Sequence, residues 1–160
     1  MKVEKYEAYR IVPFDADVEV GDFANPSKCK VKGERKKKME DCLEANRPKP
    51  YPKRDNCLSN ENAYEWAGII YSKKDTPYKL LTLELTGELY WFMSDCYNLL
   101  GDVFTHEQLD KACKDYWNSI IENSNELKLD KGYEDLFVGD AVVKALEYKN
   151  YINGESLDIE

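Results

Sequence analysis

The sequence predicts a mixed α+β domain with small antiparallel sheets. Two observations favour this fold class: segments with strand character lie near both ends of the chain with helical patterns between them, and the regular β-α-β alternation of a doubly wound sheet is missing. With 160 residues and 42% hydrophobic content, the chain is long enough to bury a core. We therefore expect one domain over residues 1–152 and a frayed acidic tail over residues 153–160.

The N-terminal third contains one predicted strand and one predicted helix. Residues 5–12 have strand character, and Pro13 stops the strand. Residues 15–23 are rich in turn formers and allow at most a short extended piece. A helix is expected over residues 34–45, where apolar residues share one face and a following proline prevents continuation.

A proline-punctuated basic segment, residues 47–54 (RPKPYPKR), follows this helix. The prolines make the segment stiff and extended, so its cations are held along a semi-rigid backbone. Ser59 or Asn60 then occupies the N-cap position of a second predicted helix, residues 60–71. A helix N-terminus beside fixed cations suits an anion. The alternative is a surface loop joined to an ordinary amphipathic helix.

The C-terminal half alternates strand and helix patterns. A strand over residues 78–85 ends at Gly87, and a shorter one covers residues 89–93. Thr105-His106-Glu107-Gln108 has the form of a capping box and opens a helix with an apolar stripe from Leu109 to Ile121, in which Tyr116 and Trp117 are interpreted as packing residues. Residues 133–146 are typical of a hairpin that turns at Gly139-Asp140.

The net charge of -8 is unevenly distributed. Residues 27–54 hold 11 Lys/Arg against 4 Asp/Glu, while the rest of the chain holds 12 against 27. The basic segment could attract a phosphate-bearing ligand, whereas the negative field of the whole chain opposes nonspecific binding to long nucleic acid. The four cations at residues 35–38 could equally form a solvated helix face.

Several classes of protein are disfavoured. The chain contains neither G-x-x-x-x-G-K-[ST] nor G-x-G-x-x-G, which sets aside P-loop NTPases and Rossmann dehydrogenases. Its five cysteines form no C-x-x-C pair and its one histidine is His106, so no metal site is expected. Adjacent carboxylates such as Glu40 and Asp41 do not form a glycosidase pair. Without a long apolar run or an apolar leader, the chain is expected to be cytoplasmic, with no membrane partner.

Four motifs, taken in order, carry a resemblance. These are YRIV around Arg10, R-x-N-C-L-S at residues 54–59 followed by ENAYEWA, D-Y-W at residues 115–117, and YEDLFVGDAVV from Tyr133. Together they resemble a bacterial family of uncharacterised domains in the ADP-ribosyltransferase-like superfamily, over residues 6–146. The resemblance implies split antiparallel β-sheets around an NAD cleft with flanking helices, and transfer of ADP-ribose from NAD, as substrate, to an unidentified protein, nucleic-acid or small-molecule acceptor.

The resemblance also implies residue roles. Glu134 would be the catalytic carboxylate, which stabilises positive charge on the ribose or takes a proton from the acceptor. Arg10 would hold the ribose or phosphate of NAD, and Tyr64 could flank the nicotinamide. Cys57 stands where serine is expected, and a thiol is a weak hydrogen-bond partner. The candidate cofactor-binding residues are Arg10, Arg54, Asn56, Cys57, Ser59 and Tyr64.

A hypothesis of a different class stays open. A small, acidic, tyrosine-rich chain could be a non-catalytic binding protein, such as a phage or plasmid inhibitor that covers a basic surface of its target. In that case the acidic remainder of the chain would be the binding face. The response to NAD distinguishes the two hypotheses, because a ligand that binds the folded state alone must stabilise it.

Overall fold

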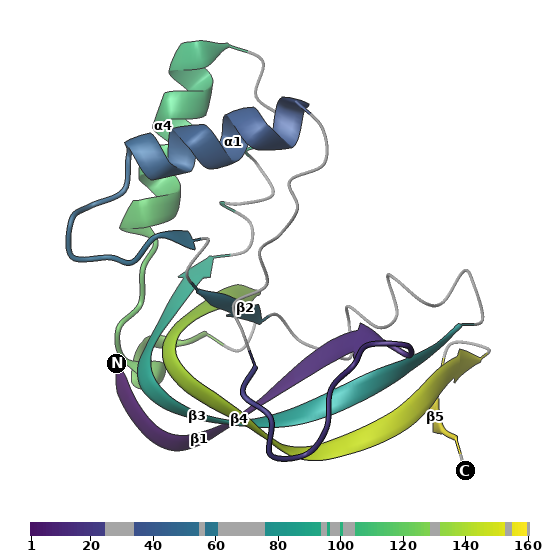
Figure 1. Ribbon diagram of the computed structural model, residues 1–160. Coiled ribbons are helices and arrows are strands. Elements are labelled where there is room, and N and C mark those ends of the chain that lie inside the picture. Colours follow the sequence, from purple (N-terminus) through teal and green to yellow (C-terminus); the bar gives the residue numbers. More distant parts are fainter. Residues whose placement is uncertain are drawn as a thin grey trace. The chain divides into compact units, whose positions relative to one another are not determined.

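A computed structural model describes the fold (Figure 1). It describes residues 1–24, 34–54, 57–60, 76–93, 96, 100, 105–128, 132–152 and 155–159, and for residues 35, 58–60, 151, 152 and 156 the backbone alone. The helices are α1 (Glu34–Ala45) and α4 (His106–Asn118), with a short 3-10 helix at Ser124–Glu126. The strands are β1 (Lys2–Pro13), β2 (Leu58–Asn60), β3 (Pro77–Met93), β4 (Tyr133–Ile152) and β5 (Glu155–Asp158).

The strands belong to one antiparallel sheet. Their order is β1-β3-β4-β2, and β5 pairs with β4 as well. Helices and an antiparallel sheet in one chain confirm the predicted α+β class. Of the described helices, neither has the length and apolar character needed to cross a membrane.

The chain divides into two compact units. The helical unit contains residue 1 and residues 26–59 and 88–138. The strand unit contains residues 2–25, 60–87 and 139–160. Strands β3 and β4 contribute residues to both units, and each changes unit beside a glycine, at Gly87 and Gly139 respectively.

In the helical unit, α1 packs against α4. Helix α1 has the bounds expected from its sequence, and its Leu43 is fully buried. Trp117 of α4 donates a hydrogen bond from its indole nitrogen to the Leu43 carbonyl oxygen at 2.8 Å, which ties the helices together. The same core contains Phe92, whose ring stacks on that of Tyr116 with 4.7 Å between centroids.

The capping box of α4 is confirmed. The Thr105 side-chain oxygen accepts from the Gln108 amide at 3.1 Å, and the Gln108 side chain accepts from the Thr105 amide at 3.2 Å. These reciprocal bonds satisfy two backbone amides that a helix N-terminus leaves without partners. The apolar stripe is also confirmed in Cys113 and Tyr116, both of which are buried, while the helix itself ends at Asn118.

In the strand unit, β1 and β3 confirm the predicted strands. The expected inward face of β3 is buried at Leu81, Leu83 and Leu85. Ala8 is the buried residue of β1, and the rest of that strand is exposed or half-buried. One residue of β1, Lys5, has a φ of 51°, which is a left-handed conformation that side chains other than glycine disfavour.

Two predicted strand ends are wrong. Gly87 does not end a strand, because β3 continues through it as one element of 17 residues. Gly139-Asp140 does not form a hairpin turn, because β4 continues through it for 20 residues. Both glycines lie inside a strand. Their φ values of 157° and 143° belong to a backbone conformation that residues with a side chain rarely adopt.

Two further elements differ from the expectation. Ser59 and Asn60 lie in β2, a strand that was not predicted; the helix expected after them lies outside the described residues. In place of a frayed tail, residues 155–158 form β5, which pairs with β4 in antiparallel register from Lys149↔Asp158 to Ile152↔Glu155. The Lys149 ammonium also contacts the Asp158 carboxylate at 2.9 Å.

Candidate functional site

A two-fold hydrogen bond joins Arg54 and Glu134 in the helical unit. The guanidinium nitrogens Nη1 and Nη2 donate to Oε2 and Oε1 of Glu134 at 3.2 and 3.1 Å. Arg54 ends the proline-rich segment, whereas Glu134 is the second residue of β4. The planar guanidinium matches the two carboxylate oxygens, so this contact is directional as well as electrostatic.

Tyr116 and Glu40 complete the group, which we call the Arg54 cluster (Arg54, Glu134, Tyr116 and Glu40). The Tyr116 hydroxyl donates to Glu134 Oε2 at 3.1 Å and accepts a bond from Arg54 Nη1. Arg54 Nε donates to Glu40 Oε2 at 3.0 Å. The guanidinium carbon also lies 5.1 Å from the centre of the Tyr116 ring. One cation therefore serves two carboxylates, and the cluster carries one excess negative charge.

Local packing explains why Arg54 turns inward. The preceding Arg47 donates to the Tyr51 carbonyl oxygen at 2.5 Å and pairs with Glu44 of α1, which fastens the proline-rich segment to the helix. The Tyr51 ring then stacks on Trp117 at 6.0 Å. Lys53 remains exposed, whereas Arg54 is half-buried and points inward, so the cations of the segment do not all face solvent.

The pair of Arg54 and Glu134 is largely withdrawn from water, whereas the Glu40 side chain is 25% exposed. The side chains of Arg54 and Glu134 expose 13% and 5% of their surfaces. Burial by itself lowers the pKa of Arg54, but Glu134, Tyr116 and Glu40 together raise that pKa above its ordinary value. Burial, followed by the Glu134 carboxylate, raises the pKa of Tyr116 well above its ordinary value. Arg54 thus stays cationic and Tyr116 stays a neutral hydrogen-bond donor.

The other predicted site residues lie in several places. Cys57 is buried in the core of the helical unit, and its thiol donates to the Lys53 carbonyl oxygen at 3.2 Å. The Ser59 backbone lies in β2. Arg10 lies on β1 in the strand unit, where burial lowers its pKa. Asn56 and Tyr64 lie outside the described residues.

Sequence reasoning missed the roles of two residues in this cluster. Tyr116 packs in the core as expected, but its hydroxyl also bonds to the charged pair. A signal for this was present, since a tyrosine on a buried stripe must find a partner for its hydroxyl. Glu40 lies three residues before the fully buried Leu43, which turns it toward the same core.

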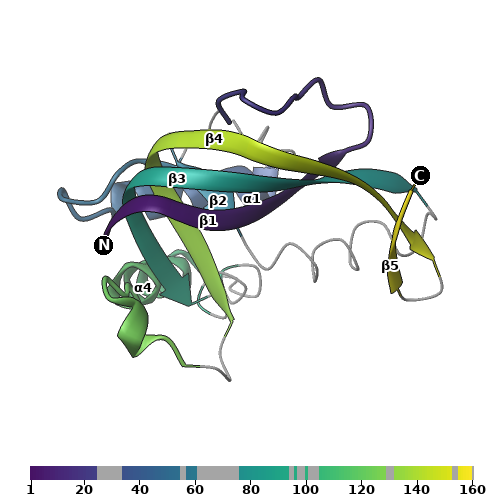
Figure 2. The same cartoon turned by 90° about the horizontal axis from the view of Figure 1, so that it is seen from below.

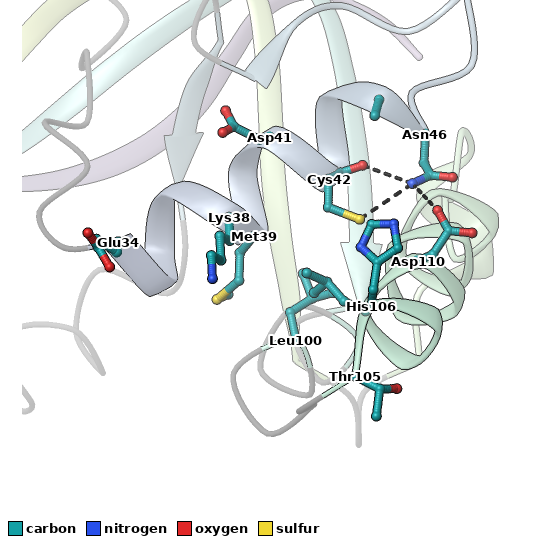
Figure 3. Close-up of a pocket in the computed structure, with 12 residues that line it drawn as sticks. Glu34, Lys38, Met39, Asp41, Cys42, Asn46, Leu100, Thr105, His106 and Asp110 are labelled. Carbon is teal, nitrogen blue, oxygen red and sulfur yellow. Dashed lines mark hydrogen bonds between the residues drawn. The ribbon is translucent and has the colours of Figure 1, made fainter.

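A separate cavity of about 800 Å³ lies between α1 and α4 (Figure 3). The Asn46 amide nitrogen donates to the Cys42 carbonyl oxygen and to Asp110 Oδ1, both at 2.9 Å, and so bridges the helices at one end of the cavity. Hydrogen bonds from Lys114 and Asn46 lower the pKa of Asp110. None of the predicted site residues that the structure describes lines this cavity. The lining residues are Glu34, Lys38, Met39, Asp41, Cys42, Ala45, Asn46, Leu100, Thr105, His106, Leu109 and Asp110.

Comparisons with known proteins add no relative: no model of a known family matches the chain, and no curated protein is similar to it. Within the described ranges, no three side chains of His, Cys, Asp or Glu are grouped so as to hold a metal ion.

Proposed function

We propose that this chain is an NAD-dependent ADP-ribosyltransferase-like protein, which transfers ADP-ribose from NAD to a protein, nucleic-acid or small-molecule acceptor. The observation that supports the proposal is the contact between Arg54 and Glu134, 80 residues apart in the chain. The resemblance assigns these residues to one NAD cleft, between split antiparallel sheets, and they lie 3.1 Å from each other.

The proposed chemistry uses the carboxylate of Glu134. In the transfer, the bond between the ribose C1′ and the nicotinamide nitrogen breaks, and its electron pair leaves with nicotinamide. The acceptor nucleophile forms the new bond to C1′, and its proton passes to Glu134. A carboxylate at this place also stabilises the positive charge that develops on the ribose. Arg54 would bind the pyrophosphate through its two terminal nitrogens.

The contacts of Glu134 impose a condition on this mechanism. Both of its oxygens already accept hydrogen bonds, from Arg54 and Tyr116, and the residue is only 4% exposed. A pyrophosphate that takes the Nη1 and Nη2 donors of Arg54 would release Glu134, while Nε keeps its bond to Glu40. Ligand binding and the availability of the catalytic carboxylate are thus coupled in the proposal.

Thermal unfolding with and without millimolar NAD tests the binding step. We expect NAD to raise the unfolding temperature of the wild type, and the rise to disappear in Arg10→Ala. Lys2→Ala, which removes an exposed cation from the same strand, is the matched control and should keep the rise. If NAD leaves the unfolding temperature of the wild type unchanged, the proposal is contradicted.

Transfer itself is tested with labelled NAD and cell extract, followed by mass spectrometry of the modified products. Glu134→Gln keeps the shape of the side chain and should abolish label transfer. Glu126→Gln, at an exposed glutamate, should leave it unchanged. Label transfer that persists in a folded Glu134→Gln protein contradicts the role assigned to Glu134.

The burial of the Arg54 cluster favours a second candidate function. A carboxylate with both oxygens hydrogen-bonded and 5% of its side-chain surface exposed is typical of a structural ion pair as well as of a catalytic group. In this case the chain is a non-catalytic acidic protein that binds a basic partner. NAD then changes neither its unfolding temperature nor its contacts.

A further inference from the structure

The strand unit carries the exposed large apolar side chains of the described residues. Every exposed large apolar residue in the described part of the chain belongs to this unit, and Val20 and Phe23 are the most exposed of them, at 62% and 67%. Single exposed apolar residues are ordinary, but a group of them marks an interaction surface. The full set is Tyr6, Tyr9, Phe14, Val20, Phe23, Tyr148, Leu157 and Ile159.

Three of these residues lie on one segment, residues 14–23, which we call the acidic-apolar segment. It runs beside β4, as the dark purple stretch next to the long strand in Figure 2. At its start, the Phe14 ring lies 5.5 Å from that of Tyr148. At its end, Phe23 forms a bridge with Val142, and the Val143 amide donates to the Asp22 carbonyl oxygen at 2.9 Å. Both ends are therefore fixed to β4.

A turn within the segment holds the apolar side chains outward. Gly21 has a φ of 95°, which a glycine adopts without strain, and its amide donates to the Val143 carbonyl oxygen at 2.8 Å. The Glu19 amide donates to Asp22 Oδ2 at 2.9 Å and closes the turn. The exposure of Val20 and Phe23 is consequently built into the local backbone.

The charges between the apolar residues have one sign. Residues 14–23, FDADVEVGDF, contain four exposed carboxylates and neither lysine nor arginine. The neighbouring Lys79 donates to the Ala16 carbonyl oxygen at 2.6 Å and lies 5.7 Å from the centre of the Tyr148 ring. All four carboxylates, those of Asp15, Asp17, Glu19 and Asp22, are exposed to solvent.

We propose that the acidic-apolar segment is a docking surface for a basic, amphipathic segment of another protein. Alternating carboxylates and apolar side chains fit a partner that alternates cations with apolar residues. A second copy that binds through the same surface is disfavoured, because the four carboxylates of each copy would face those of the other. The surface contains none of the residues assigned to NAD, so the proposal is independent of the transferase, and it supplies the binding face of the second candidate function.

A synthetic helical peptide of leucine and lysine, labelled with a fluorophore, is the probe. Its dissociation constant for the full chain is measured by fluorescence anisotropy at several salt concentrations. We expect the double variant Phe14→Ser with Phe23→Ser to weaken binding at least about tenfold, as the loss of central apolar anchors does. The double variant Asp15→Asn with Asp17→Asn should weaken binding and reduce its dependence on salt.

The controls are Tyr6→Ser and Glu4→Gln on β1. Tyr6 is 37% exposed, and it lies eight residues before Phe14, or about 26 Å along an extended chain. Both controls should bind the peptide as the wild type does. Equal losses in the test and control variants, or no loss in either, would overturn the proposal. So would a dimer in sedimentation that dissociates in Phe23→Ser, because the occupant would then be a second copy.

The result stays separate from the NAD experiments. Glu134→Gln lies outside the segment and should bind the peptide normally. If the segment variants selectively lose peptide binding and NAD has no effect, the docking surface is supported and the proposed transferase activity is contradicted. If NAD stabilises the chain and the segment variants bind the peptide as the control variants do, the transferase proposal is supported and the docking surface is contradicted.

Discussion

The guanidinium of Arg54 and the carboxylate of Glu134 meet through two hydrogen bonds, of 3.1 and 3.2 Å, although 80 residues of chain separate them. Tyr116 and Glu40 use much of the remaining hydrogen-bonding capacity of the pair. Whatever ligand the chain binds, this contact joins the proline-rich segment, β4 and both described helices in one charged group. Its energetic consequences can be measured without knowing the function.

Removal of one partner should be costly. Glu134→Ala removes the carboxylate that accepts bonds from both Nη1 and Nη2 of the half-buried Arg54, and we expect a loss of about 3 to 5 kcal/mol in the free energy of unfolding. Glu134→Gln, which keeps a hydrogen-bond acceptor, should lose less. The measurement is urea denaturation, with the exposed Glu126→Gln as the control, expected within about 0.5 kcal/mol of the wild type. A Glu134→Ala protein as stable as this control would contradict the buried ion pair.

The raised pKa of Tyr116 predicts a decline of stability in alkali. The folded state keeps this phenol protonated after the unfolded chain begins to lose its proton near pH 10, so the unfolded state binds fewer protons and stability falls as the pH rises above that value. Burial raises the pKa of Tyr51 and Tyr90 in the same direction.

Urea midpoints measured between pH 8 and 11 test this, with Tyr116→Phe as the variant. We expect the decline above about pH 10 to become shallower in Tyr116→Phe, without disappearing, since the other two tyrosines still contribute. An unchanged slope would show that Tyr116 does not titrate differently in the folded and unfolded states.

The Asn46 side chain is predicted to fix α1 against α4. Asn46→Ala removes its hydrogen bonds to the Cys42 carbonyl oxygen and to Asp110, and we expect a loss of about 1 kcal/mol in the free energy of unfolding. Lys37→Ala, at an exposed position of α1, is the control. If both variants unfold at the same urea concentration, the bridge contributes nothing measurable.

The capping box of α4 gives a fourth prediction. Thr105→Ala removes the acceptor for the Gln108 amide and should destabilise the protein by about 1 kcal/mol, whereas Thr105→Ser keeps the hydroxyl and should lose little. Far-ultraviolet circular dichroism during urea unfolding provides the measurement. Equal losses in the alanine and serine variants would mean that the methyl group, and not the hydroxyl, matters.

The sequence predicts local structure well where a local rule decides it. Helix α1 has its expected bounds, and the reciprocal bonds of Thr105 and Gln108 follow from a four-residue pattern. Gly87 and Gly139 show where local rules fail. A glycine in an apolar run is typical of a turn and also of a bend within a strand, and the choice depends on pairing with distant strands.

The same reasoning applies to the candidate site. The order of the motifs along the chain predicts that Arg54 and Glu134 belong to one site. No local sequence pattern predicts this. Their mutual contact could not be predicted, because a buried guanidinium selects its partners from residues that only the tertiary fold brings near. Tyr116 illustrates this point, since an apolar stripe predicts that its ring is buried but is silent about the partner of its hydroxyl.

The separation of Arg54 and Glu134 also has a consequence for biosynthesis. At the usual pace of translation, a ribosome needs roughly 4 to 16 seconds to add the residues between them. Throughout that interval Glu40, which precedes Arg54 in the chain, is already available to the guanidinium, whereas Glu134 has still to be made. Because β4 contributes Glu134 and the buried Leu136 to the helical unit, we expect chains that end before β4 to be more open to proteases than the full chain.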